Sequence, residues 1–414
     1  MKAEIITIGD EILIGQTIDT NSAWIGEELN KIGVEVNRIV TIKDEPEEIV
    51  SATEDSFSRA DLVLMTGGLG PTQDDKTKKT LTEYFGDHLI MNENILARIE
   101  DYFAAKGLKM LEINRQQAML PAQADIVENL KGSAAGMWFK KGKKVLLSMP
   151  GVPYEMKHIM EHQGINKIAD HFKTLPVYHK TILTTGAGES FIANKISNWE
   201  TEVRNSGLSL AYLPSPGIVK IRISGRGDDQ ESVQKEVDER GEQLKELLAD
   251  IYFGENKDKL EIMVGELLNS KGKTIATAES CTGGYIAHLL TSVPGSSAYY
   301  EGSFVTYSYN LKSEMLGVNK EVILEKGAVS EEVVVQMATG VQKKMNVDYA
   351  IAVSGIAGPD GGTEDKPVGT VWMAIATPEG VKAQKYIFGR LRMNNIRMTA
   401  ITALNCLRKE LLNQ

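Results

Sequence analysis

A regular alternation of short apolar runs with amphipathic helical patterns over roughly the first 170 residues constrains the fold of this chain more than any other feature. The runs expected to form strands are residues 5–9, 34–42, 61–67 and 144–149. The patterns expected to form helices are residues 21–32, 47–58 and 152–162. Strands that alternate with helices in this way form a doubly wound parallel sheet covered on both faces. In such an α/β sheet, ligands bind at the carboxyl ends of the strands.

The rest of the chain divides into two further parts. Residues 173–254 contain two short strand patterns and one long helical pattern rich in Glu, Lys and Leu, which indicates a small α+β module that links or dimerises. From residue 255 onward the strand–helix alternation resumes. We therefore predict an N-terminal doubly wound domain at 1–172, a central module at 173–254 and a C-terminal α/β domain at 255–414.

The composition narrows the classes of function. The chain has 414 residues and a net charge of −10, which argues against binding nucleic acid by neutralising phosphates but allows a local basic pocket. No apolar stretch is long enough to span a bilayer, and the N-terminal residues resemble a first strand and not a signal peptide. The two cysteines, Cys281 and Cys406, are too few for a disulfide framework. We expect a soluble cytoplasmic protein with no membrane partner.

The segment around Ser280 carries the most chemical information. A strand pattern at 274–277 runs into this serine, and a helix is expected to begin near Thr282. The Ser280 hydroxyl would then lie at a helix N-terminus, whose backbone N–H groups favour negative charge and could hold the oxyanion of a tetrahedral intermediate. Gly283 and Gly284 would let a substrate approach the backbone. The alternative is a plain N-cap serine, which this segment taken alone favours.

A serine nucleophile needs a base, and histidine is poorly placed to supply it. The chain has six histidines, of which only His288 lies in the C-terminal domain. It falls two turns along the helix expected after Ser280, which disfavours a Ser–His–Asp triad. Lysine can serve when burial or a neighbouring cation leaves it neutral, and a strand that ends near Tyr307 would bring Lys312 to the same crevice. A lysine that follows a strand is more often simply solvated.

Two further stretches suit a phosphorylated substrate. A glycine-rich loop at 354–363 follows a strand, where successive backbone N–H groups can form a phosphate nest. Arg390 and Arg397 bring guanidinium groups that can grip a phosphate in bidentate fashion. Taken singly, each stretch is an ordinary loop or a surface charge.

Together these four stretches closely resemble the C-terminal domain of the competence/damage-inducible CinA family, which is a nicotinamide-nucleotide amidase. The resemblance implies that Ser280 is the nucleophile, that Lys312 and Tyr307 belong to its activating network, and that this domain needs no cofactor. One position departs from the family, which usually has Asn two residues after the tyrosine, where this chain has Tyr309. The residues implied to bind substrate are Thr282, Gly283, Gly284, Ser354, Ala357, Gly358, Arg390 and Arg397.

Two motifs follow strands of the N-terminal domain. Residues 9–15 follow the first strand, and the glycine-rich residues 66–77 follow the third. Glycines let a diphosphate lie against backbone N–H groups, while Asp10, Asp74 and Asp75 offer hard oxygen ligands suited to Mg²⁺ or a similar divalent ion. The alternative is that Asp74 and Asp75 simply cap the next helix.

These motifs look like the molybdopterin-binding fold of molybdenum-cofactor proteins, in the variant found at the N-terminus of CinA, so the resemblance covers essentially the whole chain. For this variant it implies metal-dependent cleavage of ADP-ribose to AMP and ribose 5-phosphate. The metal ligands implied are Asp10, Glu11, Asp44, Asp74 and Asp75. The residues implied to lie near the ligand are Thr66, Gly67, Gly68, Pro150, Gly151 and Glu155.

We therefore expect a bifunctional enzyme of pyridine-nucleotide salvage that acts on nicotinamide mononucleotide and ADP-ribose and forms a homodimer. Two alternatives stay open. The protein could be an interaction partner in competence or DNA damage, although its acidic balance argues against direct contact with nucleic acid. Alternatively, the N-terminal domain could have retained molybdopterin binding with little catalysis.

Overall fold

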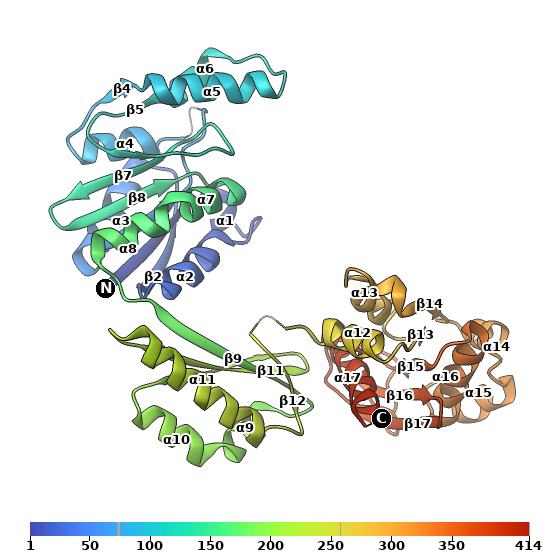
Figure 1. The fold of residues 1–414 in the computed structure, drawn as a ribbon. Helices are drawn as coiled ribbons and strands as arrows, with labels where there is room; N and C mark the ends of the chain where they lie inside the picture. Colours follow the sequence, from blue (N-terminus) through green and yellow to red (C-terminus); the bar gives the residue numbers. More distant parts are fainter. Residues whose placement is uncertain (73–74, 257, 414) are drawn as a thin grey trace. The chain divides into compact units, whose positions relative to one another are not determined.

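The computed structural model describes residues 1–72, 75–256 and 258–413, which form two compact units (Figure 1). One unit comprises Met1–Tyr178 with Arg226–Val233, and the other comprises the remaining described residues. Within the described ranges no helix is both long enough and apolar enough to cross a membrane.

The sheet of the first unit confirms the predicted doubly wound α/β fold and adds an antiparallel edge to it. The strand order is β2-β1-β3-β8-β7-β6, in which the first four strands are parallel and the last two are antiparallel. The strands are β1 (Lys2–Ile8), β2 (Glu35–Ile42), β3 (Leu62–Thr66), β6 (Asp125–Val127), β7 (Gly136–Lys141) and β8 (Lys144–Met149).

Both faces of this sheet are covered by helices. Ala3 and Ile5 of β1 pack into one buried cluster with α2, α7 and α8, whereas Ile6 and Ile8 pack into a second cluster with α3, α4 and α5. Successive side chains of a strand face opposite sides, so a strand covered on both sides is apolar along its whole length. The helices are α2 (Asn21–Lys31), α3 (Pro46–Arg59), α4 (Thr77–Tyr84), α5 (Glu93–Ala105), α7 (Pro153–Ile159) and α8 (Ile165–Phe172).

The segment between α4 and β6 forms a small subdomain that the sequence pattern did not predict. The short strands β4 (Leu89–Met91) and β5 (Met119–Pro121) pair antiparallel, and α5 and α6 (Glu112–Arg115) lie between them in the chain. Strands of three residues are too short to show a recognisable alternation of apolar and polar residues.

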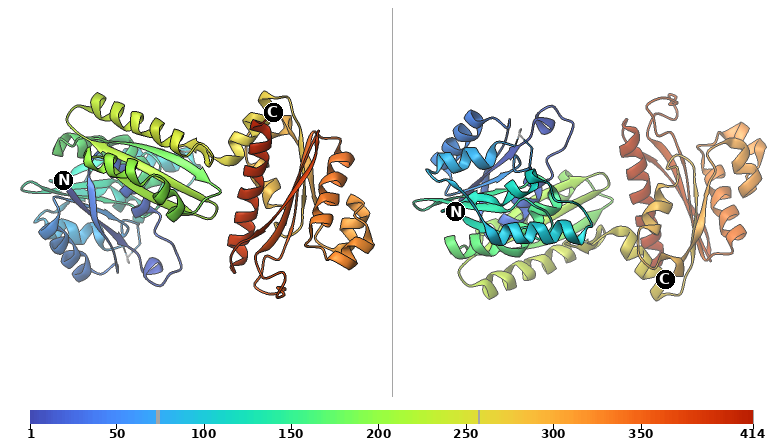
Figure 2. Two further views of the ribbon diagram at one scale, coloured as in Figure 1. Left: turned by 90° about the horizontal axis from the view of Figure 1, so that it is seen from below. Right: turned by 90° about the horizontal axis from the view of Figure 1, so that it is seen from above.

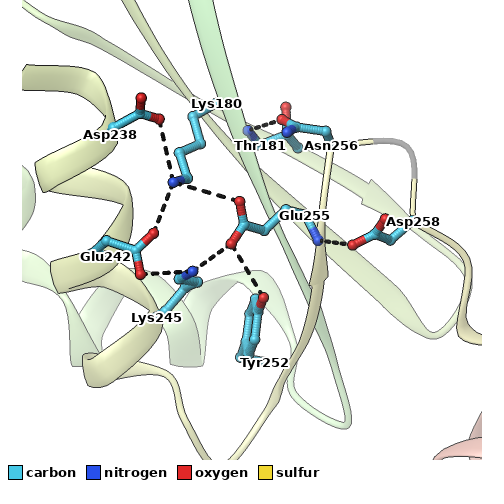
Figure 3. A network of polar contacts seen from close by, with 9 residues as sticks. All are labelled: Lys180, Thr181, Asp238, Glu242, Lys245, Tyr252, Glu255, Asn256 and Asp258. Atoms are coloured by element: carbon cyan, nitrogen blue, oxygen red, sulfur yellow. Dashed lines mark hydrogen bonds and ion pairs between the residues drawn. The ribbon is translucent and has the colours of Figure 1, made fainter. Parts of the chain in front are cut away.

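The central module is a four-stranded sheet with helices, held together partly by ion pairs. Its strand order is β10-β11-β9-β12. The half-buried carboxylate of Glu255 and the nearly buried Lys180 amine meet Glu242 and Lys245 in one network (Figure 3). This network ties β9 to α11 and β12. The elements are β9 (Val177–Thr185), α9 (Glu189–Lys195), α10 (Ser197–Asn205), β10 (Ser209–Ser215), β11 (Ile218–Arg226), α11 (Gln230–Leu247) and β12 (Tyr252–Glu255).

The C-terminal sheet is mixed, with the strand order β14-β13-β15-β16-β17. The first three strands are parallel, and β16 and β17 extend the sheet as an antiparallel hairpin. The strands are β13 (Ile275–Glu279), β14 (Tyr300–Val305), β15 (Tyr349–Gly355), β16 (Thr370–Thr377) and β17 (Gly380–Ile387).

Helices cover both faces of the C-terminal sheet as well (Figure 2). One face packs against α12, α13 and α17, and the other packs against α14, α15 and α16. The parallel strands β13, β14 and β15 end at the same edge, so the loops after them meet there. The helices are α12 (Leu260–Ser270), α13 (Tyr285–Thr291), α14 (Tyr309–Leu316), α15 (Lys320–Lys326), α16 (Glu331–Met345) and α17 (Arg392–Leu412).

Candidate active site

Ser280 follows β13 directly and lies at the carboxyl ends of the parallel strands. Its backbone N–H donates to the carbonyl oxygen of Val353 in β15 at 3.1 Å, which continues the sheet pairing up to the serine. Ser280 is 8% exposed, so its hydroxyl lies just inside the surface. The strand therefore fixes the position of the serine backbone, and residues of the surrounding loops and helices contact its hydroxyl.

Lys312 lies against this hydroxyl. Its Nζ is 2.9 Å from Ser280 Oγ, and it donates to the carbonyl oxygens of Thr306 at 2.6 Å and Tyr307 at 3.4 Å. Lys312 is fully buried, and burial lowers the pKa of its amine to about 8. With this pKa about a tenth of the Lys312 amines are neutral at pH 7, far more than for an ordinary lysine, and the neutral amine can accept a proton from a hydroxyl.

The expected helix near Thr282 starts later than predicted. A turn occupies the residues after Ser280, with Gly283 and Gly284 at φ angles of 62° and 96°, and α13 begins only at Tyr285. Positive φ angles are easy for glycine and costly for other residues, so the two glycines let the chain turn before the helix begins. Placing Ser280 at the helix N-terminus was therefore wrong.

The N–H groups at the start of α13 are already taken by Glu279, which the sequence analysis did not single out. The Glu279 side chain is fully buried, and hydrogen bonds from five donors fix it in place. The donors are Thr282 Oγ1 at 2.6 Å, Gly284 N at 3.0 Å, Ile286 N at 3.1 Å, Ala287 N at 2.8 Å and Thr277 Oγ1 at 3.4 Å. These backbone groups are therefore not available to an oxyanion at Ser280. An acid directly before the candidate nucleophile was the signal for this role.

The glycine-rich loop is fastened to the start of α17 by two side chains that the sequence analysis also missed. Arg392 donates through Nη1 to the carbonyl oxygen of Gly358 at 2.7 Å and through Nη2 to the Tyr307 hydroxyl at 3.2 Å. The buried Asn395 donates to the carbonyl oxygens of Ala357 at 2.9 Å and Gly389 at 3.0 Å. The first turn of α17 thus joins three segments that lie far apart in the sequence.

Several residues implied to bind substrate are engaged in contacts within the protein. Ser354 is 1% exposed, and its hydroxyl donates to the Ala328 carbonyl at 2.7 Å. The Thr282 hydroxyl donates to Glu279. Arg390 and Arg397 are both exposed. The structure therefore brings Ser280, Lys312 and the backbone of Tyr307 together, and among the described residues none of these other side chains hydrogen-bonds to Ser280 or Lys312.

Cys281, next to Ser280, is the other nucleophilic side chain in this turn. It is buried, and burial raises the pKa of its thiol to about 12. The thiolate is the reactive form of cysteine, so a thiol held neutral does not compete with Ser280.

The N-terminal domain contains a cavity of about 640 Å³ at the carboxyl ends of β1, β3 and β8. The two glycine-bearing motifs and the loop after β8 line it, as the strand order requires. Among its lining residues are the predicted site residues Asp10, Glu11, Asp44, Thr66, Gly67, Gly68, Asp75, Pro150, Gly151 and Glu155.

The carboxylates around this cavity differ in their surroundings. Asp75 accepts from the backbone N–H groups of Gly70 at 2.7 Å and Thr72 at 3.1 Å, which makes it the cap of a turn. Burial raises the pKa of Asp44 to about 6. Asp10 and Glu11 are exposed. Asp74 lies outside the described residues.

We tested whether these residues suit a divalent metal. In the part of the chain that the structure describes, no group of three or more His, Cys, Asp or Glu side chains is arranged to hold a metal ion. The described carboxylates therefore do not form a cation site by themselves.

Comparisons with known proteins agree along the whole chain. Three family models match: the CinA C-terminal domain over residues 257–411, the probable molybdopterin binding domain over 4–170, and the damage-inducible protein CinA KH domain over 179–254. A CinA-like protein of Cytophaga hutchinsonii is 46% identical over 409 residues, which cover 99% of this chain and 98% of that protein.

Two further relatives span similar lengths. A CinA-like protein of Flavobacterium psychrophilum is 45% identical over 417 residues, which cover 100% of this chain and 99% of that protein. A nicotinamide-nucleotide amidohydrolase PncC of Shewanella oneidensis is 39% identical over 416 residues, which cover 100% of this chain and 97% of that protein. Because relatives at this level of identity match it from end to end, this protein belongs to the CinA family.

Proposed function

We propose that the C-terminal domain hydrolyses the carboxamide of nicotinamide mononucleotide to nicotinate mononucleotide and ammonia. The observation that carries the proposal is the 2.9 Å contact between Ser280 Oγ and the buried, pKa-lowered amine of Lys312. A relative at 39% identity is named a nicotinamide-nucleotide amidohydrolase, which supports this choice of substrate.

In the first half of the reaction, neutral Lys312 accepts the proton of the Ser280 hydroxyl while Ser280 Oγ attacks the carboxamide carbon. The tetrahedral intermediate carries its negative charge on the former carbonyl oxygen. Collapse of the intermediate breaks the C–N bond, and the proton on Lys312 passes to the leaving nitrogen, which departs as ammonia. The nicotinoyl group is left as an ester on Ser280.

In the second half, a water molecule attacks the ester carbon and gives a proton to neutral Lys312. Breaking the ester bond returns that proton to Ser280 Oγ and releases the product as a carboxylic acid, which gives its remaining proton to solvent. Glu279 occupies the N–H groups at the start of α13, so in this proposal the oxyanion is bound by the backbone of the preceding turn, at Cys281 and Thr282.

Ammonia release from nicotinamide mononucleotide, measured with the purified full chain, tests this proposal. We expect release by the native chain in the presence of a chelator, and a loss of at least about a thousandfold in Ser280→Ala. Ser292→Ala, at an exposed serine directly after α13, is the matched control and should keep its activity. Substantial turnover by Ser280→Ala would overturn the assignment of the nucleophile, and no release by the native chain would overturn the function.

We also propose that the N-terminal cavity binds ADP-ribose and hydrolyses it to AMP and ribose 5-phosphate with the aid of a divalent cation. The observation that favours this function is the 640 Å³ cavity, which is lined by the glycine-bearing loop at Gly67 and Gly68, where a diphosphate could lie against the backbone. When bound, a cation would neutralise charge on the diphosphate.

Hydrolysis of ADP-ribose with Mg²⁺, and again with excess chelator, tests the second proposal. We expect activity that chelation abolishes and that Asp74→Asn reduces strongly. Asp55→Asn, an exposed acid on α3, is the control for removal of a negative charge. Retention of a pterin by the purified chain without ADP-ribose turnover would favour a molybdopterin-binding role instead.

We propose in addition that the chain forms a homodimer, as its family resemblance implies. Sedimentation equilibrium of the full chain should give twice the monomer mass of 45.5 kDa. A monomeric mass at micromolar concentration would contradict this.

A further inference from the structure

Arg392, the first residue of α17, occupies a position that the sequence analysis did not anticipate. Its Nη1 donates to the Gly358 carbonyl and its Nη2 to the Tyr307 hydroxyl. A guanidinium has five N–H groups in a planar fork, so two donations leave three for another acceptor. The side chain is exposed, and these two contacts hold its planar group in one orientation. It is a fixed positive charge at the surface.

This charge lies close to the reacting groups. The Tyr307 hydroxyl accepts a hydrogen bond from Arg392, and the Tyr307 carbonyl oxygen accepts one from Lys312 at 3.4 Å. Lys312 in turn contacts Ser280. The positive charges of Lys312 and Arg392 also lower the pKa of Cys281, although burial outweighs them and raises it. Arg392 is therefore connected to the nucleophile through two residues, Tyr307 and Lys312.

The charges of the substrate assign its two ends to different parts of this site. Nicotinamide mononucleotide carries a cationic pyridinium ring with the carboxamide at one end and a phosphate monoester at the other. The carboxamide must meet Ser280. A guanidinium repels the cationic ring and attracts the phosphate, with which it can form two parallel hydrogen bonds. An arginine near the nucleophile but apart from it suits the phosphate end.

We propose that Arg392 is the residue that recognises the phosphate monoester and thereby makes the amidase site select a nucleotide over the corresponding nucleoside. The inference rests on the proposed amidase function and deepens it. Arg392 contacts substrate away from the reacting atoms, so it sets specificity and leaves the chemical steps to Ser280 and Lys312. Tyr307 and Gly358 hold the guanidinium in place.

Arg392 fits this role better than the two arginines suggested by the sequence. Arg390 and Arg397 are exposed, and among the described residues neither hydrogen-bonds to Tyr307 or to the glycine-rich loop. A long side chain that is free in solution loses more conformational freedom when it binds than one already fixed by its neighbours. Orientation before binding therefore favours Arg392.

The test compares two substrates with the same carboxamide, nicotinamide mononucleotide and nicotinamide riboside, on the full chain. We expect Arg392→Met to reduce kcat/KM for the mononucleotide roughly 10- to 100-fold, mostly through KM, because a charge-assisted contact is lost. Turnover of the riboside, which has no phosphate, should fall far less in the same variant, so the ratio of the two kcat/KM values separates phosphate recognition from a general disturbance of the site. Arg392→Lys keeps the charge without the planar fork and should recover part of the loss.

Substitutions of other cationic residues show whether the effect belongs to Arg392 alone. Lys385→Met removes a positive charge from the exposed edge strand β17 and should leave the ratio of the two substrates as in the native chain. The inference is overturned if Arg392→Met keeps that ratio, or if Arg390→Met or Arg397→Met loses it while Arg392→Met does not.

Calorimetric titration of Ser280→Ala separates this inference from the proposed function, because it measures binding without turnover. Tighter binding of the mononucleotide than of the riboside, lost when Arg392→Met is added, supports phosphate recognition even if the native chain releases no ammonia. Equal binding of the two compounds, or no binding of either, overturns it. Ammonia release with unaltered selectivity in Arg392→Met would leave the amidase function standing and remove this inference alone.

Discussion

The two candidate sites of this protein occupy the same place in their sheets but differ in how their polar groups are satisfied. In the C-terminal domain, Ser280 contacts Lys312, and the buried Glu279 accepts from five donors. In the N-terminal domain, the buried hydroxyls of Thr66 and Thr77 have no hydrogen-bond partner among the described residues. At the first site the nucleophile, its base and Glu279 are paired within the chain, although the buried Thr306 hydroxyl beside Lys312 also lacks a partner among the described residues. At the second site, the unpaired Thr66 hydroxyl lines the cavity and is left for a ligand.

The two sites therefore differ in which polar groups must be paired before a substrate or ligand binds. A nucleophile and its base must be in contact before the substrate arrives, because reorganising them during the reaction would raise the barrier. A binding cavity can leave donors and acceptors unpaired and regain the energy when the ligand supplies their partners. We therefore expect similar substitutions to change stability in opposite directions, according to whether the polar group they remove has partners within the protein.

The largest effect is expected for Lys312→Met. Removing the base should lower kcat for ammonia release by about a thousandfold. The same change should raise the free energy of unfolding by about 3 kcal/mol at pH 7, because a buried amine with its pKa lowered to about 8 opposes folding while it is protonated. This gain should fade as the pH rises from 8 toward the ordinary lysine pKa of 10.5. Urea unfolding at several pH values measures it.

Lys180→Met is the matched control, since Lys180 is also nearly buried but lies within 3.5 Å of three carboxylates. These carboxylates raise its pKa although burial opposes them, so the charged amine stabilises the fold below its folded-state pKa. Its removal should cost about 2 kcal/mol at pH 7. If Lys312→Met and Lys180→Met destabilised the protein equally, the view of Lys312 as a strained catalytic amine would fail.

The pH dependence of turnover tests whether Lys312 is the base. Only neutral Lys312 can accept the Ser280 proton, so kcat/KM should rise about tenfold per pH unit below pH 8 and level off above it. Initial rates of ammonia release from pH 6 to pH 9.5 measure the profile. A profile flat across pH 8 would mean that another group takes the proton.

A smaller effect is expected for Glu279→Gln. The amide keeps the size of the side chain but loses its charge, and its nitrogen cannot accept hydrogen bonds from the backbone of α13. We expect kcat to fall about tenfold and the free energy of unfolding to fall by about 2 kcal/mol. Because Glu279 positions the turn and does not touch substrate, the apparent pKa of the rate profile should stay near that of the native chain. A profile shifted by a full unit would instead mean that Glu279 acts on Lys312 directly.

Much of this arrangement could be predicted from the sequence. The features that could not be predicted depend on contacts between residues that lie far apart in the chain. The strands of both sheets follow from apolar runs, because burial on both faces needs continuous apolar residues. Ser280 and Lys312 are 32 positions apart, but both belong to motifs that end neighbouring strands. Arg392 and Tyr307 are 85 positions apart and meet because β17 ends at the same edge of the sheet as β15, which brings the start of α17 to the glycine-rich loop. Helix boundaries also depend on such contacts: α13 starts late because Glu279 binds its first N–H groups.

The smallest effect concerns two threonines that face each other across neighbouring strands of the N-terminal sheet, Thr7 and Thr66. Both are buried and both line the cavity. The Thr7 hydroxyl donates to Asp19 at 2.9 Å, whereas the Thr66 hydroxyl is unpaired in the described structure. Valine has the same shape as threonine without the hydroxyl. Thr66→Val should therefore stabilise the ligand-free protein by about 1 kcal/mol, and Thr7→Val should destabilise it by about as much.

Urea unfolding without ligand measures both changes, and a titration with ADP-ribose gives the complementary result. If the Thr66 hydroxyl is kept unpaired for a ligand, Thr66→Val should bind ADP-ribose more weakly although it is the more stable protein. Equal destabilisation by the two substitutions would show that the Thr66 hydroxyl already has a partner, such as an ordered water, when no ligand is bound. The contrast between a site complete in itself and a site completed by its ligand would then not hold, because both would be satisfied before binding.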